Sequence, residues 1–143
     1  MIHITKGDFL LSDDKRQLDI DMIYHFLTNS YWAKGIARDT VEKSIQHSLC
    51  FGVYKLEQQV GFARVISDQA TFAYLADVFI VESARGNGLA KWMVMNIKAH
   101  PELQGLRRWM LATKDAHQLY AQYGGFTPVA YPNIWMEITT PYE

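Results

Sequence analysis

The chain has 143 residues, of which 49% are hydrophobic and 13% aromatic, a size and composition that predict one domain, residues 1–143, with a buried core. It carries 14 basic and 15 acidic side chains, and this balance argues against a nucleic-acid partner, because phosphate neutralisation requires a basic surface. No apolar run approaches the roughly 20 residues of a membrane span and the first residues lack a signal-peptide pattern, so we expect no membrane partner and a cytoplasmic location.

The first third of the chain predicts a weak strand and two short helices. Residues 2–11 indicate an edge strand that is interrupted at residues 6–8. Apolar side chains at Met22, Ile23, Phe26 and Leu27 then share one helical face, and Asp19 or Asp21 is positioned to cap this helix. A second helix is expected after Asp39, which together with Glu42 resembles a capping box.

The loop between these helices, residues 31–38, concentrates large amphipathic side chains, among them Tyr31, Trp32 and Arg38. Such a loop either fills space in the core or forms the wall of a pocket. The residues of the loop are compatible with both interpretations.

The middle of the chain predicts three strands that pair antiparallel, over residues 49–56, 59–67 and 71–81. Arg64 interrupts an otherwise apolar strand and is either a charge on the exposed face or a substrate contact. The only cysteine, Cys50, also lies in a predicted strand and is expected to be a buried thiol. Because the sequence contains no Cys or His cluster, we expect no metal site.

The most informative stretch, residues 74–100, is a strand followed by a glycine-containing loop and an amphipathic helix. The helix N-terminus gathers unpaired N–H groups and a partial positive charge, which suits a phosphate. Gly86 and Gly88 allow the backbone to approach an anion closely, and Arg85 adds a full charge. The spacing matches neither a P-loop nor a dinucleotide fingerprint.

Downstream, residues 107–113 predict a strand that is parallel to residues 71–81 because a helix connects the two. A helix containing Leu119 and Tyr120 follows, and residues 126–130 and 134–138 predict two closing strands. The fold class is therefore α+β, with about four helices and a mixed sheet of six or seven mostly antiparallel strands.

Two of these segments resemble the GNAT superfamily of N-acetyltransferases. Arg85, Gly88 and Ala90 match the family pattern Arg/Gln-x-x-Gly-x-Gly/Ala, and residues 119–126 are similar to its Leu-Tyr-x-x-x-Gly-Phe segment, with one extra glycine. The resemblance implies that the sheet splays between two central parallel strands and admits acetyl-CoA as co-substrate. It also implies a set of residues that contact the cofactor: Val78, Phe79, Ile80, Arg85, Gly86, Asn87, Gly88, Leu89, Ala90 and Lys91.

The resemblance further implies a general acid for the leaving thiolate. Tyr120 matches when the alignment is anchored on Leu119, and Tyr123 is the alternative when it is anchored on Phe126. The attacking amine must also lose a proton, since an alkylammonium has a pKa near 10.4, and the candidates for the base are Asp77 and His117.

The expected function is transfer of an acetyl group from acetyl-CoA to a primary amine of a small molecule or peptide, by direct transfer in a ternary complex. The alternative is a non-catalytic module that binds or senses acyl-CoA. By resemblance, the loop at residues 31–38 overhangs the acceptor site, so Tyr31, Trp32, Arg38 and Arg64 become candidates for acceptor binding. Two arginines there would favour an amine that also carries an acidic group. A homodimer is compatible with these features.

Overall fold

One six-stranded sheet organises the molecule, and its strands lie side by side in the order in which they occur in the chain. The computed structural model describes residues 1–142. The strands are β1 (His3–Lys6), β2 (Phe9–Ser12), β3 (Leu49–Lys55), β4 (Gln58–Ser67), β5 (Phe72–Ile80) and β6 (Arg108–Met110). All neighbours are antiparallel except β5 and β6. The predicted α+β class, with a mostly antiparallel sheet and one parallel pair, is thus confirmed.

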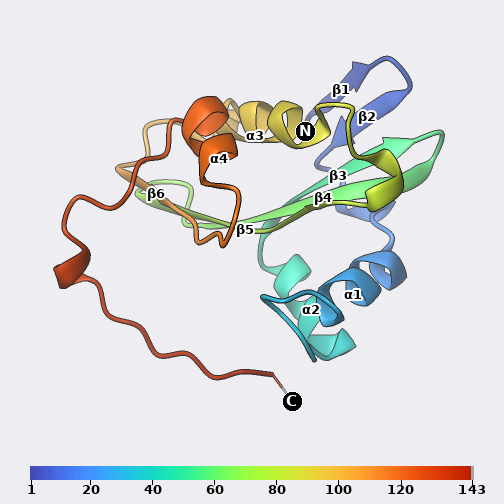
Figure 1. Cartoon of the computed structure of the whole chain (residues 1–143). Helices are drawn as coiled ribbons and strands as arrows, with labels where there is room; N and C mark the ends of the chain where they lie inside the picture. The colour runs from blue at the N-terminus through green and yellow to red at the C-terminus, as the bar shows by residue number, and fades with distance from the viewer. Residues whose placement is uncertain (143) are drawn as a thin grey trace.

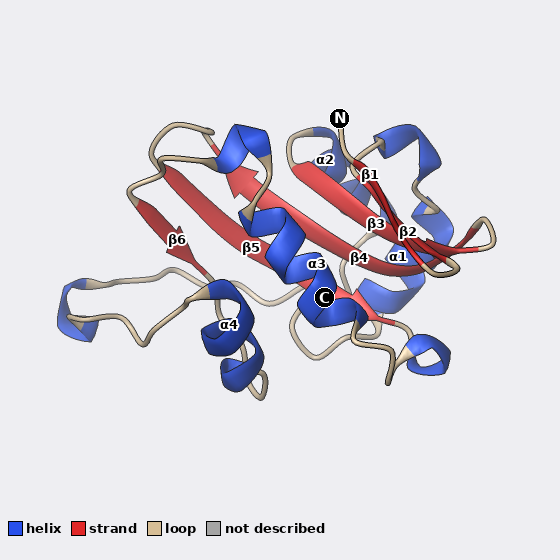
Figure 2. Cartoon of the chain, turned by 90° about the horizontal axis from the view of Figure 1, so that it is seen from above, coloured by secondary structure: helices blue, strands red, loops and turns tan. Residues whose placement is uncertain are grey.

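Four helices cover the two faces of the sheet. They are α1 (Ile20–Thr28), α2 (Arg38–Gln46), α3 (Leu89–Lys98) and α4 (His117–Gly124). Figure 1 shows α1 and α2 below the sheet and α3 and α4 above it, and Figure 2 shows α3 crossing the strands beside α4. Of these helices, none is both long and apolar enough to cross a membrane.

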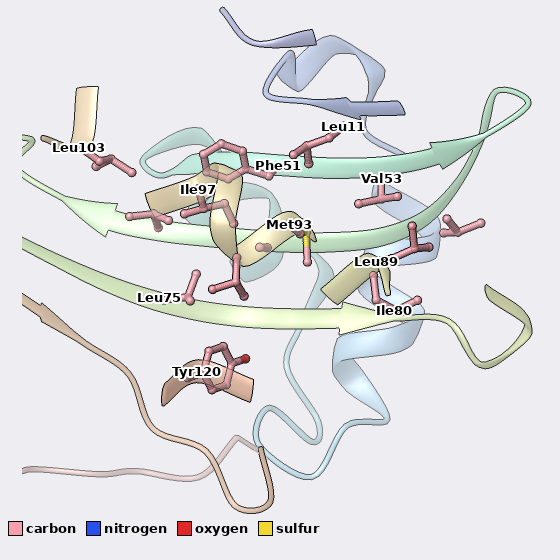
Figure 3. Packing of buried hydrophobic residues seen from close by; sticks show 14 of the residues in the cluster. Leu11, Phe51, Val53, Leu75, Ile80, Leu89, Met93, Ile97, Leu103 and Tyr120 are labelled. Atoms are coloured by element: carbon pink, nitrogen blue, oxygen red, sulfur yellow. The ribbon is translucent and has the colours of Figure 1, made fainter. Parts of the chain in front are cut away.

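Each face of the sheet has its own hydrophobic core. On the α3 face, Met93 and Ile97 are fully buried and pack with residues of the central strands, including Phe51 (Figure 3). Burying a side chain of this size is worth about 1.5–3 kcal/mol. On the other face, Ile23 of α1 and Val41 of α2 are fully buried in a second cluster. The periodicity of the helices therefore fixes which sides face the sheet.

The helix starts only partly follow the predicted caps. Asp19 caps α1, because its Oδ1 accepts a hydrogen bond of 3.1 Å from the N–H of Met22. Helix α2 begins earlier than predicted, after Ala37, and no side chain caps it. The predicted capping box at Asp39 is therefore wrong, because Asp39 already lies within the first helical turn.

A β-bulge interrupts β5 in its second half. Phe62 is opposite Phe79 and Arg64 is opposite Ala76, so Asp77 and Val78 together oppose a single residue of β4. Asp77 accordingly has a φ of +55°, a left-handed conformation that Asp tolerates better than bulky residues.

The C-terminal segment differs from the prediction. The strands expected over residues 126–130 and 134–138 are not formed, and within the described chain residues 127–142 contain only the 3-10 turn Pro132–Ile134. Residues 127–142 are all exposed. A strand needs a partner for its backbone groups, and none of the described strands pairs with this segment, so β6 forms the edge of the sheet.

Candidate active site

The site lies where the parallel strands β5 and β6 separate. Their pairing starts at Phe72 and Arg108 and ends at Tyr74 and Met110. Beyond Tyr74, β5 therefore has no strand on that side in the part of the chain that the structure describes. A cavity of about 1440 Å³ occupies this region. A strand edge that is released in this way offers backbone N–H and C=O groups to a ligand.

The glycine loop forms one end of this cavity. Gly86 and Gly88 have φ values of +86° and +70°, which side chains other than glycine rarely adopt, and Gly88 is the N-cap residue of α3. Arg85 is held by a 3.0 Å hydrogen bond from its Nε to the carbonyl of Ile80, and Asn87 Nδ2 donates to the carbonyl of Ala84 at 2.9 Å. Side chains of the loop thus fix its conformation.

The loop presents unpaired donors at the start of α3. The first helical hydrogen bond runs from the N–H of Trp92 to the carbonyl of Gly88. Within residues 1–142, the N–H groups of Leu89, Ala90 and Lys91 have no hydrogen-bond acceptor, as expected for the first turn of a helix. These groups and the helix dipole make the loop a suitable site for phosphate oxygens.

The predicted cofactor residues come together here. Nine of the ten line the cavity, namely Val78, Phe79, Ile80, Arg85, Gly86, Gly88, Leu89, Ala90 and Lys91, whereas Asn87 acts in the loop itself.

Sequence reasoning missed a further cation near the loop, which comes from β1. Lys6 Nζ lies 3.8 Å from the point that a Cβ on Gly88 would occupy. No local pattern marks Lys6, because only the sheet brings the β1–β2 turn beside α3.

Tyr120 lines the cavity. Its side chain comes from α4, is only 8% exposed and packs edge-on against Phe126. Burial raises the pKa of its phenol to about 12, with further contributions from Tyr31 and Asp115. The hydroxyl therefore keeps its proton throughout the neutral pH range and is available as a donor.

Tyr123, the alternative acid, also lines the cavity but has a different environment. Lys91 Nζ lies 5.4 Å from the centre of its ring, an arrangement typical of a cation–π contact. Because Lys91 belongs to the first turn of α3, Tyr123 lies beside the glycine loop.

Asp77 is the centre of a polar network on the other side of the cavity. Its Oδ1 accepts a hydrogen bond of 2.9 Å from Trp32 Nε1, and its Oδ2 accepts one of 2.9 Å from Arg64 Nε. Arg64 also donates to Ser48 Oγ at 3.1 Å. The side chains of Arg64 and Asp77 are 16% and 9% exposed, so this ion pair is shielded from solvent. The bulge at Asp77 places its carboxylate together with the side chains of Trp32 and Arg64.

Aromatic side chains surround this network. Tyr31 and Trp32 meet edge-on with ring centres 5.1 Å apart, and Phe26 stacks on Phe79 at 3.8 Å. Lys114 Nζ lies 5.4 Å from the centre of the Tyr31 ring, a contact that the sequence did not indicate. All five residues line the cavity.

Two of the predicted candidates lie elsewhere. Arg38 binds Asp21 and Glu42 on the surface of α1 and α2 and does not line the cavity. His117 is exposed at the first residue of α4 and is also outside it. Of the predicted acceptor residues, the structure brings Tyr31, Trp32 and Arg64 together, without Arg38.

Comparison with known proteins agrees with this geometry. Residues 19–126 match the model of the acetyltransferase (GNAT) family. An acetyltransferase-like protein of Gibberella zeae is 34% identical over 151 residues, covering 85% of this chain and 84% of the relative. The chain belongs to the GNAT acetyltransferase family.

Solved structures show the same fold. A GNAT-family protein of Xanthomonas campestris pv. campestris has a TM-score of 0.90 and 51% identity, covering 93% of this chain and 94% of that one. An acetyltransferase-like protein of Clostridium acetobutylicum, crystallised with acetyl-CoA, has a TM-score of 0.64 and 15% identity over 92% of this chain and 94% of that one.

Proposed function

We propose that this protein is an N-acetyltransferase that moves an acetyl group from acetyl-CoA to a primary amine of a small molecule or peptide, by direct transfer in a ternary complex. The observation that carries the proposal is that one cavity joins three parts: the loop at Gly88, the open edge of β5 and the hydroxyl-bearing ring of Tyr120. Phosphate groups, a thioester and a leaving thiolate need different environments, and these three parts supply them.

In the proposed complex, the diphosphate of acetyl-CoA binds at the N-terminus of α3, with Arg85, Lys91 and Lys6 as nearby cations. The acetyl and pantetheine groups extend along Val78, Phe79 and Ile80. Because β5 has no strand on this side beyond Tyr74 among the described residues, its backbone N–H groups are available to the thioester carbonyl. One preplaced donor to the developing oxyanion is worth about 3 kcal/mol.

The amine nitrogen attacks the thioester carbonyl carbon, the carbon–sulfur bond breaks, and the electron pair leaves on sulfur. We assign Tyr120 as the donor to that sulfur. An alkyl thiol has a pKa of about 8.5, whereas burial raises the pKa of Tyr120 to about 12. Full proton transfer from the phenol to the thiolate would cost roughly 5 kcal/mol. Tyr120 therefore stabilises the thiolate chiefly by a hydrogen bond.

The proton of the attacking amine must also be accepted. We propose Asp77 as its acceptor, because its carboxylate lies on the cavity wall beside the released part of β5. Each carboxylate oxygen can accept two hydrogen bonds, and Trp32 and Arg64 use one on each. Tyr31 and Trp32 provide an apolar wall for the acceptor. With Arg38 outside the cavity and Arg64 paired with Asp77, the arrangement does not favour acceptors that carry a carboxylate.

Two measurements test this proposal together. Acetyl-CoA at 100 times its dissociation constant should add about 2.7 kcal/mol to the free energy of unfolding, a shift of several degrees in Tm, and NAD or ATP should give much less. Release of free coenzyme A should then depend on an amine, screened across polyamines, amino acids, aminoglycosides and peptides.

The two results separate the alternatives. A Tm shift with acetyl-CoA but no amine-dependent release would identify a non-catalytic acyl-CoA-binding module. A larger Tm shift with NAD than with acetyl-CoA would contradict both the N-acetyltransferase and the acyl-CoA-binding module.

A further inference from the structure

The charged side chains at the acceptor end of the cavity are already compensated by the protein itself. This end is formed by Phe26, Tyr31, Trp32, Arg64 and Asp77. Arg64 Nε and Asp77 Oδ2 form an ion pair at 2.9 Å that is shielded from solvent. The ammonium of Lys114, which also lines the cavity, lies over the Tyr31 ring. An acceptor with a second charge would need an uncompensated partner of opposite sign, and these pairs do not offer one.

Two more ionisable side chains line the cavity, but solvent screens them. Asp115 precedes α4 and His25 lies on α1, and both are exposed. Charges that face solvent interact weakly with a charged ligand, because water and salt screen them. Recognition of the acceptor by its charge is therefore weak at this end.

The surface that this end does offer is aromatic, and it is fixed in place. Tyr31 is 58% exposed and Trp32 is 40% exposed, and the Phe26 ring lies 6.3 Å from that of Trp32. The indole N–H of Trp32 donates to Asp77 Oδ1 at 2.9 Å. The hydroxyl of Tyr31 accepts a 3.3 Å hydrogen bond from the N–H of Lys114. A flat apolar group can bind to such rings without first ordering them, which lowers the cost of binding.

This aromatic surface lies beside the groups proposed for the reaction. Trp32 contacts the carboxylate of Asp77, the proposed acceptor of the amine proton. Tyr31 lies close to Tyr120, the proposed donor to the leaving thiolate, since burial and then Tyr31 raise the pKa of that phenol. An amine held at Asp77 therefore places the carbon skeleton that it carries against the ring of Trp32.

We propose that the acceptor is an arylalkylamine, which is a primary amine joined by a short alkyl linker to a flat aromatic ring, with no second charge. This inference rests on the acetyl-transfer function proposed above. The amine nitrogen forms a bond to the thioester carbonyl carbon, and the carbon–sulfur bond breaks with its electron pair on sulfur. One amine proton passes to Asp77, from which it reaches the thiolate through solvent. The products are an N-arylalkyl acetamide and coenzyme A.

Release of free coenzyme A with a matched set of amines tests this acceptor class. The amines are phenethylamine, butylamine, putrescine and phenylalanine, each at saturating acetyl-CoA. Butylamine lacks the ring, putrescine replaces it by a second ammonium, and phenylalanine keeps it but adds a carboxylate. The expected kcat/KM for phenethylamine is about tenfold or more above that of each other amine, because phenethylamine alone combines a ring with a single charge.

Trp32→Phe and Trp32→Leu form a matched pair, because both lose the N–H donor to Asp77 and only the first keeps a ring. The preference for phenethylamine over butylamine should persist in Trp32→Phe. In Trp32→Leu the two amines should have about equal kcat/KM values, mainly because the KM of phenethylamine rises. Both variants should keep the wild-type Tm shift with acetyl-CoA, which shows that they are folded.

The outcomes separate this inference from the function on which it rests. Butylamine, putrescine or phenylalanine used as well as phenethylamine would overturn the arylalkylamine assignment and leave acetyl transfer itself intact. A preference for the ring that survived in Trp32→Leu would do the same. Release with no amine at all would instead contradict the proposed acetyl transfer, and the arylalkylamine assignment with it.

Discussion

The two sides of the active-site cavity are built in different ways. The side proposed for the cofactor, at Gly86 and Gly88, uses backbone N–H groups and left-handed φ values, so its shape depends on short local sequence. The side proposed for the acceptor joins Trp32, Arg64 and Asp77 from three separate parts of the chain through side-chain hydrogen bonds. The cofactor side therefore has a local sequence pattern, whereas the acceptor side exists only once the sheet and the α1–α2 loop have assembled.

This difference predicts that mutations on the two sides of the cavity should affect different kinetic and binding constants. Changes on the cofactor side should remove acetyl-CoA binding, and changes on the acceptor side should alter the acceptor KM while leaving the acetyl-CoA KM nearly constant. Substitutions in the glycine loop should reduce activity the most, and substitutions on the exposed surface of α1 and α2 should reduce it the least.

Gly88→Val should abolish the Tm shift with acetyl-CoA and reduce activity to background. A β-branched residue at a φ of +70° is strained, and its side chain would occupy the phosphate-binding loop. Gly105→Val is the matched control, because Gly105 has a φ of +75° and no atom lies within 4 Å of the point that a Cβ there would occupy. If Gly105→Val also lost the shift, backbone strain and not the site would explain the result.

Tyr120→Phe should lower kcat by roughly 10²-fold, the usual effect of removing one hydrogen-bond donor to a developing negative charge, while leaving the Tm shift with acetyl-CoA intact. The change removes the donor to the leaving thiolate and keeps the ring that packs on Phe126. Tyr123→Phe should change kcat far less, because its ring lies by Lys91. Equal kcat values in both variants and the wild type would remove Tyr120 from the mechanism.

Trp32→Ala should raise the acceptor KM about tenfold, since it removes both the apolar wall and a hydrogen bond to Asp77. The acetyl-CoA KM should hardly change. Trp32→Phe separates the two effects, because it keeps an aromatic ring and loses only the donor. An acetyl-CoA KM that rose in parallel would show that the two sides of the cavity are not independent.

The buried phenol of Tyr120 should make the protein sensitive to alkali. Below pH 10 the folded and unfolded states both hold this proton. Between pH 10 and about 12 the unfolded chain loses it while the folded state keeps it, so the free energy of unfolding should fall by up to about 1.4 kcal/mol per pH unit from this group. Denaturation at several pH values should show a shallower fall in Tyr120→Phe than in the wild type. Identical slopes would contradict this assignment.

Arg38→Ala should have the smallest effect. Its partners Asp21 and Glu42 are exposed, and exposed ion pairs contribute about 0–1 kcal/mol. Kinetic assays should give unchanged KM values for acceptor and acetyl-CoA. A clear rise in the acceptor KM would return Arg38 to the acceptor site, as the sequence alone suggested.

The parts that were predictable from sequence share one property, which is that their cause is local. Four consecutive residues contain Arg85, Gly86 and Gly88, and the spacing of apolar residues in the helix that follows indicates its buried face. The antiparallel order of β3, β4 and β5 followed from their short connections, and the parallel pairing of β5 with β6 followed from the helix between them.

The parts that were not predictable depend on distant partners. Arg64 looked like a free cation for an acceptor carboxylate, but folding pairs it with Asp77. Lys6 reaches the glycine loop at Gly88 from β1, which no spacing rule connects to α3. Residues 126–130 and 134–138 have the composition of strands, yet composition cannot say whether an edge is available to pair with them.

The bulge at Asp77 also controls which way the end of β5 faces. Leu75 packs in the core on the α3 side, while Phe79, four positions later, packs in the core on the α1 side, although regular alternation would place both on one face. The single additional residue therefore reverses the alternation of side chains, so that odd-numbered residues face α3 before the bulge and α1 after it. Deleting one residue here would remove the bulge but leave Phe79 facing α1 and Ile80 facing α3; what it would remove is the left-handed residue that carries the carboxylate between Trp32 and Arg64. In relatives of this protein, loss of the additional residue should therefore preserve both hydrophobic cores and change only the polar network at the cavity.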